Sequence, residues 1–123
     1  MGQAKETLDA LRQPARDLRD HIPDVFRGHA ELSAAAVADG VLDSKTKELI
    51  ALAIAVTRQC DGCIAAHARN AARKGATEGE VAEALGVAIS MNGGPGTVYG
   101  PRAFAAFQEF NTKSGDGEAT ATA

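Results

Sequence analysis

Aromatic residues are scarce in this chain of 123 residues. Tryptophan is absent, and one tyrosine and four phenylalanines supply the whole aromatic content. Strands favour aromatic and β-branched residues, whereas alanine is the strongest helix former, and the chain has 26 alanines. This composition favours an all-α protein made of closely packed helices over one built from sheets.

The chain also lacks an excess of positive charge and any long apolar run. Its 13 Lys and Arg residues face 16 Asp and Glu residues, for a net charge of −3 at pH 7, whereas a nucleic-acid footprint needs a basic patch. No run approaches the roughly 18 apolar residues of a membrane span, and residues 1–20 lack the apolar core of a signal peptide. We therefore expect a cytoplasmic protein that binds neither nucleic acid nor membranes.

Cysteine is limited to Cys60 and Cys63. A chain of this length buries about two thirds of its surface on folding, so a core can form without disulfide staples. In a reducing compartment, a lone pair at this spacing is more often redox-active or metal-binding than structural. The two cysteines are thus the first candidates for chemistry.

Apolar residues recur at helical spacing along most of the chain and divide it into three parts. We expect an N-terminal helical segment at 1–22, a compact helical domain at 23–112, and a disordered tail of small and polar residues at 113–123. Within the first part, Pro14 is expected to kink or split the helix. The stretch at 92–96, with three glycines and a proline, is expected to interrupt the helices before the last one begins.

Two consecutive segments predict a central antiparallel pair of helices. In the first, 45–58, every residue at 49–56 is apolar, and a helix that is apolar on all sides lies in a large core or in an oligomer interface. Because a small chain has little room to surround a helix, we expect copies of the protein to associate. The second helix begins at Cys60 or Asp61, after a short turn at Gln59.

The segment CDGCIAAH at 60–67 gathers reactive side chains on one helix face. Cys60, Cys63 and His67 are three and four residues apart and share that face. The amide ends of the first turn and the helix dipole stabilise a thiolate, the reactive form of cysteine, which by itself slightly favours Cys60. His67, one turn after Cys63, can accept the thiol proton.

Glu48 is the candidate third member of this group, and it lies on the preceding helix. In an antiparallel pair, the rise of about 1.5 Å per residue places it near His67 or beyond, rather than beside Cys60. A carboxylate there orients the imidazole and raises its basicity, which makes an acid–histidine–thiol chain. Taken one at a time, His67 can also be an ordinary helix residue and Glu48 a solvated first-turn acid.

Two other interpretations stay open. Cys60, Cys63, His67 and Glu48 could supply four ligands to a zinc ion, although structural zinc sites usually draw ligands from two separated knuckles. Alternatively, the protein is a redox sensor or an oligomeric scaffold whose cysteines oxidise too slowly for turnover.

The order Glu48, then Cys60-x-x-Cys63-x-x-x-His67, resembles the AhpD-like alkylhydroperoxidases of the carboxymuconolactone decarboxylase family. The resemblance extends over about 26–110 and includes the flanking segments DGVLDSKTKELIALAIAVTRQC and ARNAARKGATEGEVAEALGVAISMNGGP. It implies an all-helical homo-oligomer, a trimer or a hexamer. It also implies a thiol-dependent peroxidase that reduces small organic hydroperoxides and needs no cofactor or metal.

The resemblance assigns a role to each site residue. Cys63 attacks the peroxide oxygen and becomes a sulfenic acid, and Cys60 resolves it as a disulfide. His67 and Glu48 form the proton relay. A thiol or dithiol reductant, or a reductase protein, then resets the pair by thiol–disulfide exchange.

The chain departs from some peroxidase members, which carry a histidine between the two cysteines. Here Asp61 and Gly62 occupy these positions, and a carboxylate beside a thiol raises the thiol pKa and slows attack on peroxide. The decarboxylase members of the family do not depend on the cysteine pair, so its presence argues against their activity. His21 and His29 are the histidines that such lactone or decarboxylation chemistry could use.

Overall fold

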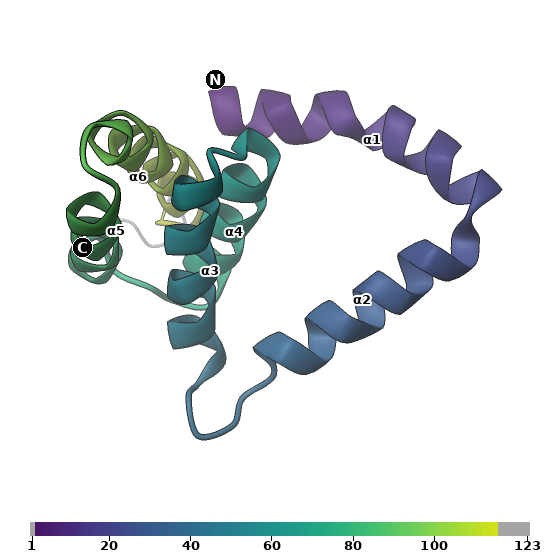
Figure 1. The fold of residues 1–123 in the computed structure, drawn as a ribbon, viewed down its shortest axis with the longest axis horizontal. Coiled ribbons are helices and arrows are strands. Elements are labelled where there is room, and N and C mark those ends of the chain that lie inside the picture. The colour runs from purple at the N-terminus through teal and green to yellow at the C-terminus, as the bar shows by residue number, and fades with distance from the viewer. Residues whose placement is uncertain (1, 116–123) are drawn as a thin grey trace.

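The computed structural model describes residues 2–115, and all regular secondary structure in that range is helical (Figure 1). The helices are α1 (Gln3–His21), α2 (Pro23–Val37), α3 (Ser44–Arg58), α4 (Asp61–Arg73), α5 (Glu78–Asn92) and α6 (Gly94–Gly115). The predicted all-α fold is therefore confirmed. None of these helices is both long enough and apolar enough to cross a bilayer.

The core lies between the last four helices, which pack against one another. Small residues dominate it, because alanines on α3, α4, α5 and α6 let the helix backbones approach closely. Larger side chains fill the remaining space. The largest fully buried ones are Leu52, Val56, Val81 and Phe107.

A tight connection makes α3 and α4 the predicted antiparallel pair. Asp43 caps the start of α3 by accepting a hydrogen bond from the Thr46 amide at 2.8 Å. Gln59 ends the helix in the left-handed conformation, with φ 55°, and the Cys60 amide donates back to the Ala55 carbonyl at 3.2 Å. The chain thus reverses within two residues, and Cys60 stands at the start of α4.

The start of α6 differs from the prediction. The expected interruption at 92–96 shrinks to Gly93, whose φ is 67°, and α6 begins at Gly94. Pro95 falls in the first turn, where a missing amide hydrogen costs nothing. A Cβ atom on Gly96 would lie 2.8 Å from the Cα atom of Ile89 on α5. Residues that break a helix in isolation therefore form the close contact between α5 and α6.

Pro14 does not split α1, which runs without interruption from Gln3 to His21. A proline inside a helix removes one amide donor and frees the carbonyl four residues earlier. That carbonyl belongs to Ala10, an exposed residue, so water can take the place of the missing donor.

The first turn of α1 is anchored to the bundle. Ala4 is buried, and the Ala4 and Lys5 amides donate to the Glu109 carboxylate of α6 at 3.1 and 2.9 Å. A carboxylate is favourable at a helix N-terminus, where amide hydrogens lack partners. The predicted segment 1–22 thus begins as part of the packed structure.

The first half of α1, which includes Leu8 and Leu11, packs on α4, whereas the second half of α1 and all of α2 extend away from α3–α6, as Figure 1 shows in purple and blue. No residue of α2 is buried, and its apolar residues Val25 and Leu32 are exposed. Within the described residues, most of the surface of these two side chains therefore remains open to solvent. Of the predicted tail at 113–123, positions 113–115 continue α6 and 116–123 lie outside the described residues.

Candidate active site

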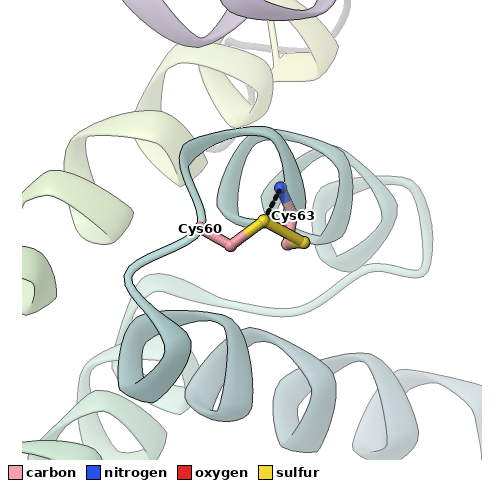
Figure 2. The surroundings of a disulfide bond; sticks show 2 residues. All are labelled: Cys60 and Cys63. Atoms are coloured by element: carbon pink, nitrogen blue, oxygen red, sulfur yellow. Dashed lines mark hydrogen bonds between the residues drawn. A yellow bond between two sulfur atoms is a disulfide. The ribbon is translucent and has the colours of Figure 1, made fainter. Parts of the chain in front are cut away.

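Cys60 and Cys63 form a disulfide at the N-terminus of α4 (Figure 2). Their Cα atoms are 5.2 Å apart, which is within the range of ordinary disulfides. Cys60 is the N-cap residue, and its sulfur accepts a hydrogen bond from the Cys63 amide at 3.2 Å, drawn as the dashed line in Figure 2. The cysteine pair therefore sits on the positive end of the helix.

This position suits a sulfur that alternates between disulfide and thiolate. The first-turn amides, which lack partners within the helix, and the helix dipole both favour negative charge at Cys60 and Cys63. The two residues differ in accessibility, since Cys63 is exposed and Cys60 is partly buried. Solvent and small molecules thus reach Cys63 more easily.

Glu48 and His67 form a second pair beside the first. The Glu48 side chain on α3 is 3% exposed, and its Oε1 lies 2.7 Å from Nδ1 of His67 on α4, whose side chain is 32% exposed. A buried carboxylate needs a hydrogen-bonded partner. An ionised Glu48 accepts from the Nδ1–H of the imidazole, which leaves Nε2 with its lone pair as a base.

Asn70 is a further member that sequence reasoning missed. Its Nδ2 donates to Oε2 of Glu48 at 3.5 Å, a long hydrogen bond, so both carboxylate oxygens have a partner. Asn70 lies one helical turn after His67 on the same face of α4, and this spacing is the signal that could have found it.

The structure thus brings the four predicted residues together as two pairs within one helix pair. Glu48 lies against His67, as the antiparallel geometry requires, and not beside Cys60. Among the described residues no hydrogen bond joins the imidazole to a sulfur, and one helical turn separates Cys63 from His67. The remaining histidines, His21 and His29, are exposed on α1 and α2, outside this site.

The two residues between the cysteines also have defined neighbours. Asp61 accepts from Nη1 of Arg102 on α6 at 3.4 Å. A Cβ atom on Gly62 would lie 3.1 Å from Cδ1 of Leu11, so the glycine leaves room for α1 over the first turn of α4. The dipeptide that departs from some peroxidase members is therefore in contact with both α1 and α6.

The zinc hypothesis gains no support from this arrangement. Within the described part of the chain, no three His, Cys, Asp or Glu side chains gather as a metal ion requires. Two of the four candidate ligands, Cys60 and Cys63, are bonded to each other.

Known proteins resemble this chain in sequence. The profile of the carboxymuconolactone decarboxylase family matches residues 23–110. An uncharacterized protein of Cupriavidus necator is 46% identical over 77 residues, which are 63% of this chain and 68% of that protein. The uncharacterized protein 4 in the cox locus of Paracoccus denitrificans is 41% identical over 80 residues, which are 65% and 72% of the two chains.

Solved structures share its fold. A carboxymuconolactone decarboxylase family protein from Legionella pneumophila has a TM-score of 0.86 at 39% identity. The superposition covers 89% of this chain and 97% of the Legionella chain. A family protein from Thermotoga maritima with a possible role in the antioxidative response has a TM-score of 0.73 at 28% identity, covering 87% and 94%. The family profile spans more than half of the chain and agrees with these structures, so the protein belongs to the carboxymuconolactone decarboxylase family.

Proposed function

We propose that the protein is a thiol-dependent peroxidase that reduces small organic hydroperoxides through Cys60 and Cys63. The observation that carries the proposal is the cystine at the N-terminus of α4, one turn before His67, which is hydrogen-bonded to the buried Glu48. Acid, histidine and thiol on neighbouring turns are the parts of an activated nucleophile. The family membership and the possible antioxidative role of the Thermotoga relative support the same conclusion.

The first half of the cycle oxidises Cys63. Nε2 of His67 accepts the thiol proton, and the thiolate attacks the terminal oxygen of the hydroperoxide. The O–O bond breaks, Cys63 becomes a sulfenic acid, and the leaving alkoxide takes the proton from His67 to give the alcohol. Glu48 holds the imidazole in the tautomer that accepts this proton and stabilises the imidazolium in between.

The second half closes and reopens the disulfide. The Cys60 thiol attacks the sulfenic sulfur, and hydroxide leaves with the thiol proton as water. A dithiol of the cell then reduces the disulfide through a mixed disulfide and is itself oxidised. Each turnover thus converts one hydroperoxide and one dithiol into an alcohol, water and one disulfide.

Accessibility and position support Cys63 as the attacking residue. It is the more exposed cysteine, and it lies one turn before His67. Cys60 is partly buried, and its sulfur accepts a hydrogen bond from the Cys63 amide. This setting suits a resolving thiolate held at the N-cap. The N-cap position alone would favour Cys60.

Two single variants test this assignment. Each reduced protein receives one equivalent of an organic hydroperoxide in the presence of dimedone, which labels sulfenic acids. We expect a labelled Cys63 in Cys60→Ser and no label in Cys63→Ser. A label on Cys60 alone would reverse the assignment, and the absence of label in both variants would refute the peroxidase function.

A slow disulfide oxidoreductase or redox sensor is the second candidate. The observation that favours it is Asp61, whose carboxylate directly follows Cys60 and opposes a thiolate. Both candidates predict a redox-active pair, but only the peroxidase predicts rapid loss of thiols with stoichiometric hydroperoxide. The rate of that loss separates them.

A further inference from the structure

Arg102 on α6 reaches the dipeptide between the two cysteines. Its Nη1 lies 3.4 Å from Oδ1 of Asp61, and its guanidinium carbon lies 4.7 Å from the centre of the Tyr99 ring, one turn earlier on α6. Helices α4 and α6 pack directly against each other. Two separate contacts on rigid elements therefore hold the guanidinium beside the first turn of α4.

The negative charge of Asp61 disfavours a thiolate in the neighbouring redox pair. Asp61 directly follows Cys60 in the chain, and its carboxylate competes with a thiolate for the positive end of the same helix. A carboxylate near a thiol disfavours the thiolate. Because the thiolate is the nucleophile in both peroxide reduction and disulfide exchange, an uncompensated Asp61 would slow both reactions.

The surroundings leave Arg102 as the compensating group. Asp61 and Arg102 line a cavity of about 350 Å³ between α1, α4 and α6, together with Glu109. The Glu109 carboxylate is already engaged by the Ala4 and Lys5 amides. Of the described side chains, Arg102 is the one cation that forms an ion pair with Asp61.

We propose that Arg102 is a positioning residue for the redox pair. It cancels the charge of Asp61 and so keeps the thiolate form of the cysteine pair energetically accessible. The inference rests on the proposed function only in requiring that Cys60 and Cys63 be redox-active. It holds whichever oxidant the protein uses. It also explains how the motif accommodates Asp61, because the residue that departs from some peroxidase members is paired with a cation.

The expected effect is modest, because the Arg102 and Asp61 side chains are 44% and 55% exposed. Charge pairs of this kind change equilibria by about two- to fivefold. For a two-electron couple this corresponds to about 10 to 20 mV. Salt screens exposed charges, so the effect is measured at low ionic strength and should shrink as salt is added.

Two measurements on Arg102→Gln test the proposal. The first is the equilibrium in which two glutathione thiols reduce the protein disulfide and form one glutathione disulfide. The second is the rate at which iodoacetamide alkylates the reduced protein at neutral pH. If the reactive thiol is ionised at neutral pH, loss of the Arg102 charge changes the reduction equilibrium. If the thiol is protonated at that pH, the loss changes the fraction of thiolate and therefore the alkylation rate. One of the two readouts must therefore change.

We expect Arg102→Gln to lower the reduction equilibrium constant or the alkylation rate by about two- to fivefold. Asp61→Asn added to this variant should return the value to that of the wild type or beyond, since it removes the charge that Arg102 compensates. Arg102→Lys, which keeps the charge, should change the value less than Arg102→Gln. A merely structural loss would not be reversed by a second substitution at Asp61.

Arg27→Gln is the matched control. Arg27 also forms an ion pair, with Asp24 on α2, and α2 does not pack against α4. This variant should leave both readouts at the wild-type value. Unchanged readouts in Arg102→Gln, or a change that Asp61→Asn fails to reverse, would overturn the proposal. Neither readout uses peroxide, so this failure would be distinct from a failure of the peroxidase function.

Discussion

Glu48 is the residue whose setting most needs a functional reason. Its carboxylate is removed from water on α3, and burial of an unpaired charge is costly. His67 and Asn70 on α4 each form a hydrogen bond with one of its two oxygens. Because the His67 ring is partly exposed, the pair connects the interior of the bundle with the surface near the cysteines.

Substitutions at this pair should slow the oxidation of Cys63. In Glu48→Gln the neutral amide no longer stabilises the imidazolium, and we expect the reaction with an organic hydroperoxide to slow by about 10- to 100-fold. His67→Ala removes the base itself, and the expected loss is about 100-fold or more. The measurement is the rate of thiol loss in the reduced protein under excess hydroperoxide.

Glu83→Gln is the matched control, because Glu83 is an exposed glutamate on α5. It should react at the wild-type rate. A His67→Ala variant that also reacts within twofold of the wild type would contradict the proton relay, even if Cys63 is the nucleophile.

Residues close in sequence could be placed by spacing alone. The shared face of Cys60, Cys63 and His67 follows from one helix, and the position of Glu48 follows from a helix pair joined by a short turn. Arg102 could not be found in this way, because it is 41 residues from Asp61 and depends on how α6 packs against α4.

At the scale of the helix, end signals were more reliable than breaking signals. Thr77 and Glu80 form a capping box at the start of α5, and Gly75, with φ 86°, follows the end of α4. The hydrogen bond from the Thr77 amide, together with Lys45, lowers the pKa of the Glu80 carboxyl. These features depend on neighbours in the sequence, so the sequence predicts them well.

Breaking signals failed where the environment tolerates the residue. Pro14 lies on an exposed stretch of α1, and Pro95 lies in the first turn of α6. In both places the missing amide hydrogen has no buried acceptor to leave unpaired. A proline or glycine therefore predicts an interruption only when the position within the helix is known.

The contact between α5 and α6 gives a test at this scale. Gly96→Ala should destabilise the protein by about 1 to 3 kcal/mol, because the new methyl group would meet the backbone of Ile89 and force the helices apart. Gly94→Ala is the control, since a Cβ atom there meets nothing within 4 Å. Urea unfolding measures both variants. Equal stability of the two would show that the close contact is unimportant.

At the scale of the molecule, much apolar surface has no partner among residues 2–115, which the structure describes. Ile50 and Ile54, one turn apart on α3, are 46% and 56% exposed, and Val87 and Met91 are exposed on the neighbouring α5. Contiguous exposed apolar surface marks an interaction site. We propose that this face of α3 and α5 joins copies of the chain into a homo-oligomer, a trimer or a hexamer.

Light scattering coupled to size-exclusion chromatography tests the assembly. The wild type should have a mass that is a multiple of 12.6 kDa. The double variant Ile50→Asp/Ile54→Asp should shift to the monomer, because two charges on the proposed interface would be buried without partners. Val41→Asp, in the exposed connection between α2 and α3, should keep the wild-type mass. A monomeric wild type, or a double variant of unchanged mass, would contradict this interface.

The sequence predicts the fold class and the central helix pair, but not which surfaces meet inside one chain. Helical periodicity shows that residues such as Val25 and Leu32 share a face with other apolar residues. It does not show whether that face packs on the same chain, and in the structure no residue of α2 is buried. The path of α1 and α2 away from α3–α6 therefore could not be predicted.

The most direct test of the central claim is a thiol count with stoichiometric peroxide. The protein is reduced, freed of reductant and mixed with one equivalent of an organic hydroperoxide, and free thiols and intact mass are followed in time. The account predicts rapid loss of both thiols together with about 2 Da, as Cys60 and Cys63 form one intramolecular disulfide. Thiols that persist for hours in the wild type would contradict it.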